Sequence, residues 1–248
     1  MLEVQCLAVN YRGVSGLEPV SFQIANSQVV GIIGPNGAGK STMMKAMLGL
    51  VPKVSGSVQY CLSPLHQQLQ KVAYVPQRSQ IDWDYPITVW NVVMMARTRQ
   101  IGWFRTPGKA AREIVTSALE QVEMLALKHR RIGELSGGQQ QRVFLARALA
   151  QQAEILLFDE PFTGVDKKTE AIIFDVFSEL RSLGKILLVS SHEWGQALHR
   201  LDRLLLLNKC LIADGSPQQV MTPENLHRAY GTSLQNPLYQ DWDSSLFC

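Results

Sequence analysis

"VVGIIGPNGAGKST", residues 29–42, joins a continuous apolar run to a glycine-rich segment that ends in a lysine and two hydroxyl residues. The apolar run predicts a strand that is buried on both faces. The spacing of Met43, Met47 and Leu50 predicts that a helix follows at once. The stretch matches the pattern G-x-x-x-x-G-K-[ST] in the strand-then-helix context that the pattern requires. A glycine-rich turn that arose by chance is the alternative, and both flanking elements argue against it.

The chemistry of this motif is phosphate binding. Its glycines let backbone N–H groups approach a phosphate closely, and the start of the new helix adds its positive dipole end. Lys40 is expected to reach the β- and γ-phosphates of ATP, and Ser41 is expected to bind Mg²⁺. The predicted ATP-binding loop consists of Gly34, Pro35, Asn36, Gly37, Ala38, Gly39, Lys40, Ser41 and Thr42.

A second motif, "ILLFDEP" (155–161), is an apolar strand that ends in two acids. Asp159 is predicted to lie beside the phosphate loop and to hold Mg²⁺ through water. Glu160 faces elsewhere and can polarise a water in line with the γ-phosphate. Many surface strands end in Asp-Glu, so the signal becomes specific only together with Lys40 and Ser41 upstream.

A third motif, "LSGGQQQR" (135–142), opens a helix with a serine and two glycines. A hydroxyl and bare amides at a helix N-terminus form another phosphate cradle. A flexible turn that caps an ordinary helix is the alternative. Because the first loop already supplies one cradle, the second indicates a head-to-tail dimer in which these residues close on the ATP of the partner copy. The predicted residues are Ser136, Gly137, Gly138 and Gln139.

Six motifs, "GPNGAGKST", "VPQ", "LSGGQ", "ILLFDEP", "TGVD" and "SSH", follow one another in an order that resembles the ATP-binding cassette (ABC) family over residues 1 to about 230. The resemblance implies an α/β fold with a RecA-like P-loop NTPase core, an antiparallel β subdomain and an inserted helical subdomain at about 88–152. It implies one ATPase domain over 1–231. The remaining residues, 232–248, lack periodicity and are predicted to be a C-terminal tail.

The same resemblance assigns further site residues. Tyr11 stands where the family has an aromatic that stacks on adenine, although by itself it reads as a strand-end aromatic packed locally. Gln77 matches the glutamine that contacts Mg²⁺ and the attacking water. Asp166 matches an acid at the dimer seam, and His192 matches a histidine that touches the γ-phosphate. The expected catalytic residues are thus Lys40, Glu160 and His192, and the expected Mg²⁺ ligands are Ser41, Gln77 and Asp159.

Composition excludes several function classes. The net charge of +3, from 24 basic and 21 acidic residues, is too weak to indicate nucleic-acid binding. The longest apolar runs are far shorter than the roughly 20 residues that cross a bilayer, and the N-terminus lacks the features of a secretory signal. Four scattered cysteines without a CxxC pattern indicate reduced thiols in a cytosolic protein.

Because no membrane span is expected, the resemblance implies an ATPase that docks on separate permease subunits at the cytoplasmic face of the bacterial plasma membrane. The stretch "RSQIDWDYPITVWNVVMMAR" (78–97) is similar to the ATPases of manganese, zinc and iron importers, with manganese or zinc favoured. Such importers also use a metal-binding extracytoplasmic protein. The residues expected to face the permease are Asp82, Trp83, Asp84 and Tyr85.

Alternatives stay open at this point. One is import of iron chelates, haem or cobalamin, and another is a soluble ABC ATPase that acts on DNA or ribosomes. A metal site in the 82–85 stretch is disfavoured, because two acids are too few for a cage of hard oxygen ligands.

Two local expectations concern backbone geometry. Many relatives have a Gly-Glu turn before the strand that leads to the phosphate loop, and this chain has Asn26 and Ser27 there. Because Asn tolerates turn geometry, the turn is expected to be retained. Helical spacing further predicts that one apolar helix face consists of Ile114, Ala118, Val122 and Leu125.

Overall fold

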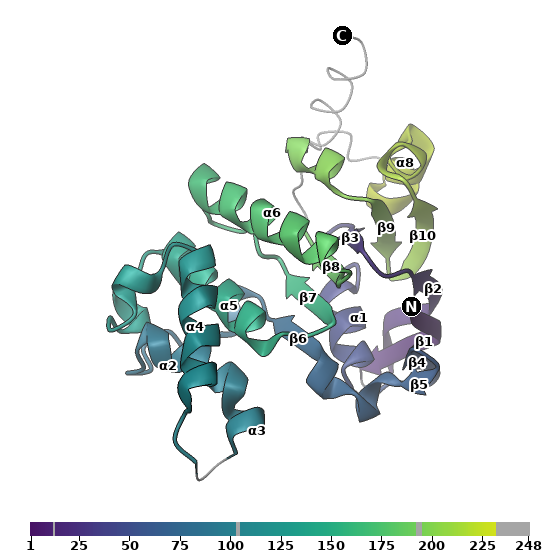
Figure 1. The fold of residues 1–248 in the computed structure, drawn as a ribbon. Helices are drawn as coiled ribbons and strands as arrows, with labels where there is room; N and C mark the ends of the chain where they lie inside the picture. The colour runs from purple at the N-terminus through teal and green to yellow at the C-terminus, as the bar shows by residue number, and fades with distance from the viewer. Residues whose placement is uncertain (12, 103–104, 192–194, 232–248) are drawn as a thin grey trace.

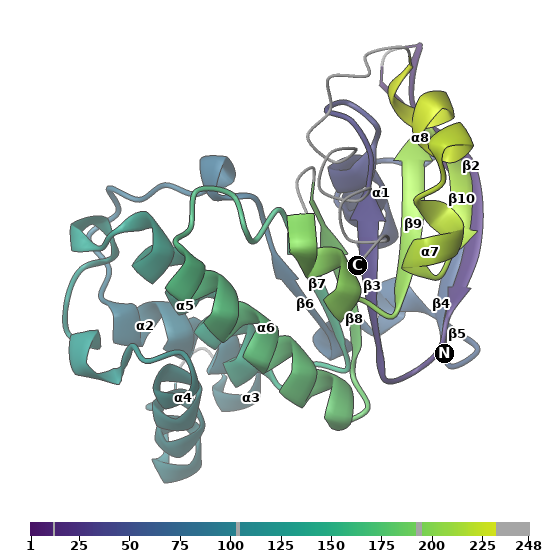
Figure 2. The ribbon, with the colours of Figure 1, turned by 90° about the horizontal axis from the view of Figure 1, so that it is seen from above.

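The computed structural model describes residues 1–231 with the exception of 12, 103–104 and 192–194 (Figure 1). Figures 1 and 2 place two sheets at one side of the molecule and a group of helices at the other. Within this part of the chain, no helix is long and apolar enough to cross a membrane.

The larger sheet has the strand order β10-β9-β3-β8-β7-β6. Its strands β6, β7, β8, β3 and β9 pair in parallel, whereas β10 pairs antiparallel with β9. The strands are β3 (Gln28–Ile33), β6 (Val72–Val75), β7 (Ile155–Asp159), β8 (Ile186–Ser190), β9 (Arg203–Asn208) and β10 (Cys210–Gly215). Because the carboxyl ends of β3, β6, β7 and β8 meet at one edge, the loops that follow these four strands are brought together there.

The smaller sheet is antiparallel, with the order β2-β1-β4-β5. It consists of β1 (Leu2–Tyr11), β2 (Val14–Ile24), β4 (Ser55–Tyr60) and β5 (Ser63–Pro64). Helix α1 (Lys40–Met47) packs between the sheets, and its Met43, Met44 and Met47 share one core with residues of both. The phosphate loop is therefore held from two sides.

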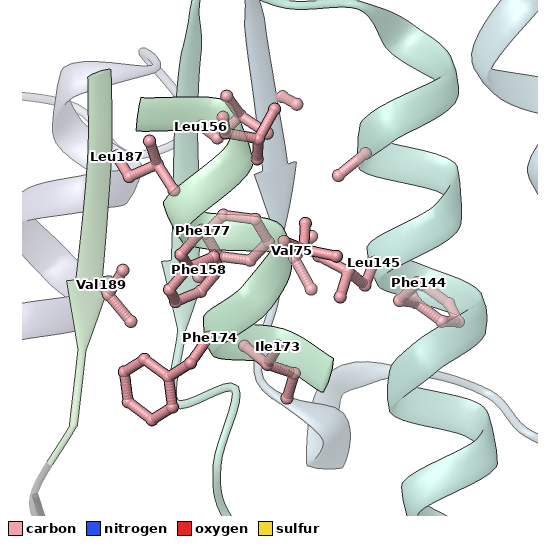
Figure 3. Close-up of a cluster of buried hydrophobic side chains, with 14 of the residues drawn as sticks. Val75, Phe144, Leu145, Leu156, Phe158, Ile173, Phe174, Phe177, Leu187 and Val189 are labelled. Atoms are coloured by element: carbon pink, nitrogen blue, oxygen red, sulfur yellow. The ribbon is translucent and has the colours of Figure 1, made fainter. Parts of the chain in front are cut away.

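Strand β3 is buried on both faces, as its uninterrupted apolar sequence predicts. Val30 and Ile32 belong to the core that surrounds α1, whereas Val29 and Ile33 belong to the core on the opposite face. The second core lies beneath α6 (Lys167–Ser182), where Phe177 packs 4.8 Å from Phe158 between ring centroids (Figure 3). These two cores position the strand ends that carry the site.

Of the remaining helices, α2 to α5 lie away from the smaller sheet, whereas α7 and α8 lie beside β9 and β10 (Figure 2). The bounds of these helices are α2 (Val89–Met94), α3 (Thr98–Ile101), α4 (Lys109–Gln121), α5 (Gly137–Gln151), α7 (Pro217–Val220) and α8 (Pro223–Tyr230). Thr88 caps α2 by accepting a hydrogen bond from the N–H of Asn91 at 3.3 Å. Gln152 ends α5 in the left-handed region, with φ of 57°.

One local expectation was confirmed and one was wrong. The chain turns between β2 and β3 as expected, with the positive φ of 62° on Ser27. The side-chain oxygen of Asn26 accepts a hydrogen bond from the N-terminal ammonium at 3.1 Å. The predicted helix face is shorter than its spacing suggested, because α4 ends at Gln121 and Glu123 turns the chain with φ of 55°. The buried residues of α4 are Val115, Ala118 and Leu119.

Candidate active site

The phosphate loop connects β3 to α1 and holds the side chain of Lys40 at its centre. The Lys40 ammonium is 5% exposed and donates hydrogen bonds to the carbonyl oxygens of Gly34 (2.7 Å) and Pro35 (3.0 Å). Burial lowers the pKa of Lys40, and the charges of Glu160 and Asp159 oppose that shift. A buried cation surrounded by backbone dipoles is suited to bind an anion such as phosphate.

Two glycines of this loop are required by close backbone approaches. A Cβ atom at Gly34 would overlap the carbonyl oxygen of Leu207 in β9. Gly39, which precedes α1 with φ of 94°, lies so close to β2 that a Cβ atom would be 2.9 Å from the carbonyl oxygen of Gly16. Because glycine has no side chain at these two positions, the phosphate loop can pass close to both β9 and β2.

Asp159 ends β7 and is almost completely buried, with 1% exposed. Its Oδ1 atom accepts hydrogen bonds from the hydroxyls of Ser41 (2.9 Å) and Ser190 (2.7 Å), and its Oδ2 atom accepts one from Tyr74 (3.3 Å). Burial, followed by the charge of Asp159 and the hydrogen bond to it, raises the pKa of Tyr74. Tyr74 therefore stays a neutral donor toward the carboxylate.

The pairing of Ser41 and Asp159 fits Mg²⁺. Both present hard oxygen atoms, and Mg²⁺ is commonly held by one or two protein oxygens together with substrate phosphates and water. Among the described residues, no group of three or more His, Cys, Asp and Glu side chains converges, so a cage made only of protein side chains is not seen in that part of the chain. Gln77 lies near this pair through its contact with Glu160.

Glu160 is turned away from Asp159 by a left-handed backbone conformation with φ of 52°. Its backbone N–H donates to the hydroxyl of Ser190 at 3.0 Å. The carboxylate Oε2 accepts hydrogen bonds from the side-chain amide of Gln77 at 2.8 Å and from Thr163 at 3.4 Å. The structure thus brings together the two side chains that the sequence assigned to the attacking water.

Ser190 and Tyr74 are site residues that the sequence motifs did not single out. Ser190 is fully buried at the end of β8, directly opposite Asp159 in the parallel register. Its hydroxyl donates to the carboxylate of Asp159 and accepts a hydrogen bond from the backbone N–H of Glu160. The sequence feature that could have indicated Ser190 is its place at the end of an apolar strand, just before "SH". Tyr74 belongs to β6, on the other side of β7.

The "LSGGQ" segment begins α5 with a reciprocal cap. Ser136 accepts a hydrogen bond from the N–H of Gln139 (3.3 Å), and the Gln139 side chain accepts one from the N–H of Ser136 (2.9 Å). Gly138 packs on α6, because a Cβ atom there would be 2.7 Å from the Thr169 hydroxyl oxygen. Within this chain, the cap occupies the side chains of Ser136 and Gln139.

Asp166 lies at the start of α6, close to the contact between Gly138 and Thr169. Its carboxylate accepts a hydrogen bond from the backbone N–H of Thr169 at 2.7 Å, and hydrogen bonds with the backbone and side chain of Thr169 hold the pKa of Asp166 below its usual value. The carboxylate is exposed and ionised, so it caps α6 and remains accessible to another molecule.

Tyr11 is 43% exposed at the end of β1. Its ring lies over Gly16, where a Cβ atom would be 2.8 Å from a ring carbon, and Gly16 in turn contacts Gly39 of the phosphate loop. The Tyr11 ring thus packs on Gly16, lies beside the phosphate loop and remains partly exposed to solvent.

His192 lies outside the described residues. The preceding Ser191 donates its N–H to the carbonyl oxygen of Ile32 in β3 at 3.1 Å.

The 82–85 stretch is only partly the exposed surface that the sequence predicted. Asp82, Asp84 and Tyr85 are exposed, and Asp82 accepts a hydrogen bond from the N–H of Asp84 at 3.1 Å. Trp83 is half-buried instead, with its ring 5.3 Å from that of Phe144 between centroids. Its large apolar ring gains more by packing on α5 than by facing water.

The ABC transporter family model matches residues 17–163. The chain belongs to the ABC transporter family. The α/β fold with a RecA-like P-loop core is confirmed by solved ATP-binding cassettes, among them a dimeric post-hydrolysis structure of the cassette MJ0796 bound to ADP and phosphate. That structure is 25% identical to this chain, with a TM-score of 0.77, and the match covers 87% of this chain and 98% of the other.

Two relatives of this ABC ATPase match over nearly their whole length. The manganese transport system ATP-binding protein MntB of Listeria monocytogenes is 45% identical, over 93% of this chain and 96% of the relative. The zinc transport system ATP-binding protein TroB of Treponema pallidum is also 45% identical, over 96% of this chain and 90% of the relative. The chain is thus an ATP-binding subunit of the ABC type, and the predicted ATPase activity is confirmed.

Proposed function

We propose that this ABC ATPase powers the import of manganese or zinc ions through a separate membrane permease. The observation that carries the proposal is the pair of contacts Ser41–Asp159 and Gln77–Glu160, which together form a hydrolysis site. The partly exposed 82–85 stretch follows Gln77 closely in sequence. The substrate class is supported by the two relatives named for manganese and zinc transport. Import of iron chelates, haem or cobalamin is the second candidate. It is supported by the similarity of the 78–97 stretch to that wider group and by a 40% identical relative from Yersinia pestis named for chelated iron transport.

Each site residue has a defined task in the proposed hydrolysis. Lys40 moves from its backbone carbonyls to the β- and γ-phosphates and stabilises the charge that develops on them. Ser41 and Asp159, with Gln77, hold Mg²⁺, which when bound neutralises phosphate charge. Glu160 accepts a hydrogen bond from the attacking water and orients it toward the γ-phosphate. In this proposal His192 contacts the γ-phosphate, and Tyr11 stacks on the adenine.

The active form in this proposal is a head-to-tail homodimer that encloses two ATP molecules. The N-terminus of α5 combines a positive helix end with the backbone amides of Gly137 and Gly138, and anions bind favourably at such ends. Ser136, Gln139 and Asp166 lie beside those amides and complete the surface that contacts the ATP of the partner copy. The dimeric MJ0796 structure with ADP and phosphate supports this arrangement.

The proposed assembly places the chain at the cytoplasmic face of a bacterial plasma membrane, as a peripheral subunit. A metal-binding extracytoplasmic protein delivers the ion to the permease, and nucleic acid has no part. Residues 1–231 act as one ATPase domain with a helical subdomain at about 88–152, and 232–248 form a tail. Trp83 fixes the docking stretch on α5, and Asp82, Asp84 and Tyr85 face a helix of the permease.

Substitution of Asp84 and Tyr85 by alanine tests the docking surface. We expect the ATPase rate of the isolated subunit to stay within about twofold of wild type, because neither side chain contacts the site. Stimulation by the permease is expected to fall about tenfold or more, since tyrosine is enriched among the interface hot spots whose truncation costs about 2 kcal/mol or more. The measurement is phosphate release by the subunit alone and with the permease in lipid vesicles.

A control is Leu62→Ala, which removes an exposed apolar side chain, 86% exposed compared with 60% for Tyr85, from the turn between β4 and β5 of the smaller sheet. This variant is expected to keep full stimulation. If the Asp84 and Tyr85 double variant is stimulated as strongly as the control, the 82–85 stretch does not face the permease.

A further inference from the structure

Ser190 places one buried hydroxyl group between the two acidic residues at the end of β7. The residue ends β8 and is completely shielded from solvent. Its hydroxyl donates to Oδ1 of Asp159 at 2.7 Å and accepts a hydrogen bond from the backbone N–H of Glu160 at 3.0 Å. Because a hydroxyl can donate and accept at the same time, this one group connects the proposed Mg²⁺ ligand to the residue proposed to orient water.

The backbone of Glu160 has a conformation that depends on such support. Its φ of 52° lies in the left-handed region, which is uncommon for a residue with a side chain and persists where the surroundings hold it. The N–H of Glu160 also donates to the carbonyl oxygen of Ser190 at 3.2 Å, so Ser190 holds this N–H with both its backbone and its side chain. In this conformation the Glu160 carboxylate contacts Gln77 at 2.8 Å. Removal of the Ser190 hydroxyl would therefore loosen the backbone that directs the carboxylate.

Tyr74 contacts Asp159 from the other neighbouring strand. Strands β6 and β8 lie on either side of β7, and the Tyr74 hydroxyl donates to Oδ2 of Asp159 at 3.3 Å. The hydroxyl of Tyr74 thus acts on Asp159, whereas the hydroxyl of Ser190 acts on Asp159 and on the backbone of Glu160. This difference makes the two contributions separable by substitution.

We propose that Ser190 is a positioning residue for ATP hydrolysis, whose hydroxyl fixes the Asp159 carboxylate and the Glu160 backbone relative to each other. Tyr74 positions the Asp159 carboxylate from the opposite side. Partners that hydrogen-bond to a metal ligand commonly change metal affinity or activity ten- to hundredfold when they are removed. The inference rests on the roles of Asp159 and Glu160 in the proposed function, and it adds what holds these two residues in place.

Ser190→Ala and Tyr74→Phe separate the two contributions. Phosphate release by the isolated full-length chain is measured at increasing Mg²⁺ concentrations with saturating ATP. Both variants are expected to need about tenfold more Mg²⁺ for the half-maximal rate, because each removes one donor from Asp159. At saturating Mg²⁺, Ser190→Ala is expected to remain about tenfold below the wild-type kcat, since the Glu160 backbone has lost a hydrogen bond, and Tyr74→Phe is expected to come within about twofold of wild type.

Two further variants test whether the Ser190 hydroxyl acts through Glu160. Ser190→Thr keeps the hydroxyl and is expected to restore kcat to within about threefold of wild type. In the Glu160→Gln background, Ser190→Ala is expected to lower kcat less than about twofold further at saturating Mg²⁺, because both changes impair the same carboxylate.

Calorimetric titration with ATP provides a readout that does not depend on hydrolysis. In EDTA, Ser190→Ala and Tyr74→Phe are expected to bind ATP within about twofold of wild type, because both hydroxyls act on the Mg²⁺ side of the site. The increase in ATP affinity on addition of Mg²⁺ is expected to need about tenfold more Mg²⁺ in both variants.

Val189→Ala is the control for loss of stability. Val189 precedes Ser190 in β8 and is buried in the core beneath α6 (Figure 3). Because successive side chains of a strand point to opposite faces, this variant opens a cavity on the other face of the sheet. It is expected to lower the melting temperature and to keep kcat within about twofold of wild type. If Ser190→Ala does not fold, Ser190→Cys replaces it, since a thiol is only a weak donor.

Three results would overturn the inference: wild-type kcat in Ser190→Ala at saturating Mg²⁺, a Ser190→Thr variant as slow as Ser190→Ala, or equal losses of kcat in Ser190→Ala and Val189→Ala at the same fall in melting temperature. Wild-type hydrolysis by Glu160→Gln would contradict the proposed function and this inference with it. Wild-type hydrolysis by Ser190→Ala beside a slow Glu160→Gln would contradict the inference alone.

Discussion

Glu160→Gln is expected to lower kcat for ATP hydrolysis about thousandfold, within the range of general acid–base catalysis. The substitution keeps the size of the side chain and its contact with Gln77 at 2.8 Å, but it removes the charge that orients the attacking water. ATP then binds without being hydrolysed, so a stable dimer is expected when ATP is added. The measurements are steady-state phosphate release and size-exclusion chromatography with and without ATP.

Glu120→Gln, on the exposed side of α4, is the control and is expected to keep the wild-type rate. Hydrolysis by the Glu160 variant within about tenfold of wild type would show that this carboxylate does not act on the water. A variant that stays monomeric with ATP would contradict the proposed homodimer.

Lys40→Ala is expected to weaken ATP binding about ten- to hundredfold, which corresponds to the loss of a charged hydrogen bond of about 1.5–3 kcal/mol. Hydrolysis is expected to fall further than binding, because the charge on the phosphates grows toward the transition state. The ammonium is buried and bonded to Gly34 and Pro35, so no solvent cation replaces it in that geometry. Calorimetric titration with ATP and phosphate release measure the two effects.

Lys45→Ala serves as the control on the same helix, since Lys45 lies in the last turn of α1, away from the loop. It is expected to bind ATP like wild type. Equal loss of affinity in both variants would mean that Lys40 acts through general charge or stability and not through contact with phosphate.

The parts of the site that could be predicted from the sequence are those encoded in short, continuous motifs. The phosphate loop follows from glycines at fixed spacing between a strand and a helix, and it forms as expected around Lys40. Asp159 and Ser41 are 118 residues apart, yet both motifs are specific enough to predict that they meet, and they do so at 2.9 Å. The phosphate loop and the Ser41–Asp159 contact can therefore be predicted from the chemistry of short motifs and from the parallel order of their strands.

The contacts that could not be predicted join single side chains from separate elements. Ser190 contacts the Asp159 carboxylate and the Glu160 backbone because β8 lies next to β7, and that neighbour relation is a property of the sheet order. Trp83 was expected to face the permease together with residues 82–85, but its ring packs on Phe144 of α5 instead. Arg78 resembles any charged loop residue in the sequence, yet its side chain donates to Gln140 of α5 at 2.8 Å.

The central claim, that hydrolysis at Glu160 drives import of manganese or zinc, is tested most directly by metal uptake in cells. A strain that lacks this gene would receive either the wild-type chain or Glu160→Gln, and accumulation of radioactive manganese and zinc would be measured separately. We predict that wild type restores uptake of one of the two ions and that Glu160→Gln does not. Uptake that is equal with both chains, or unchanged for both metals by the deletion, would contradict the claim.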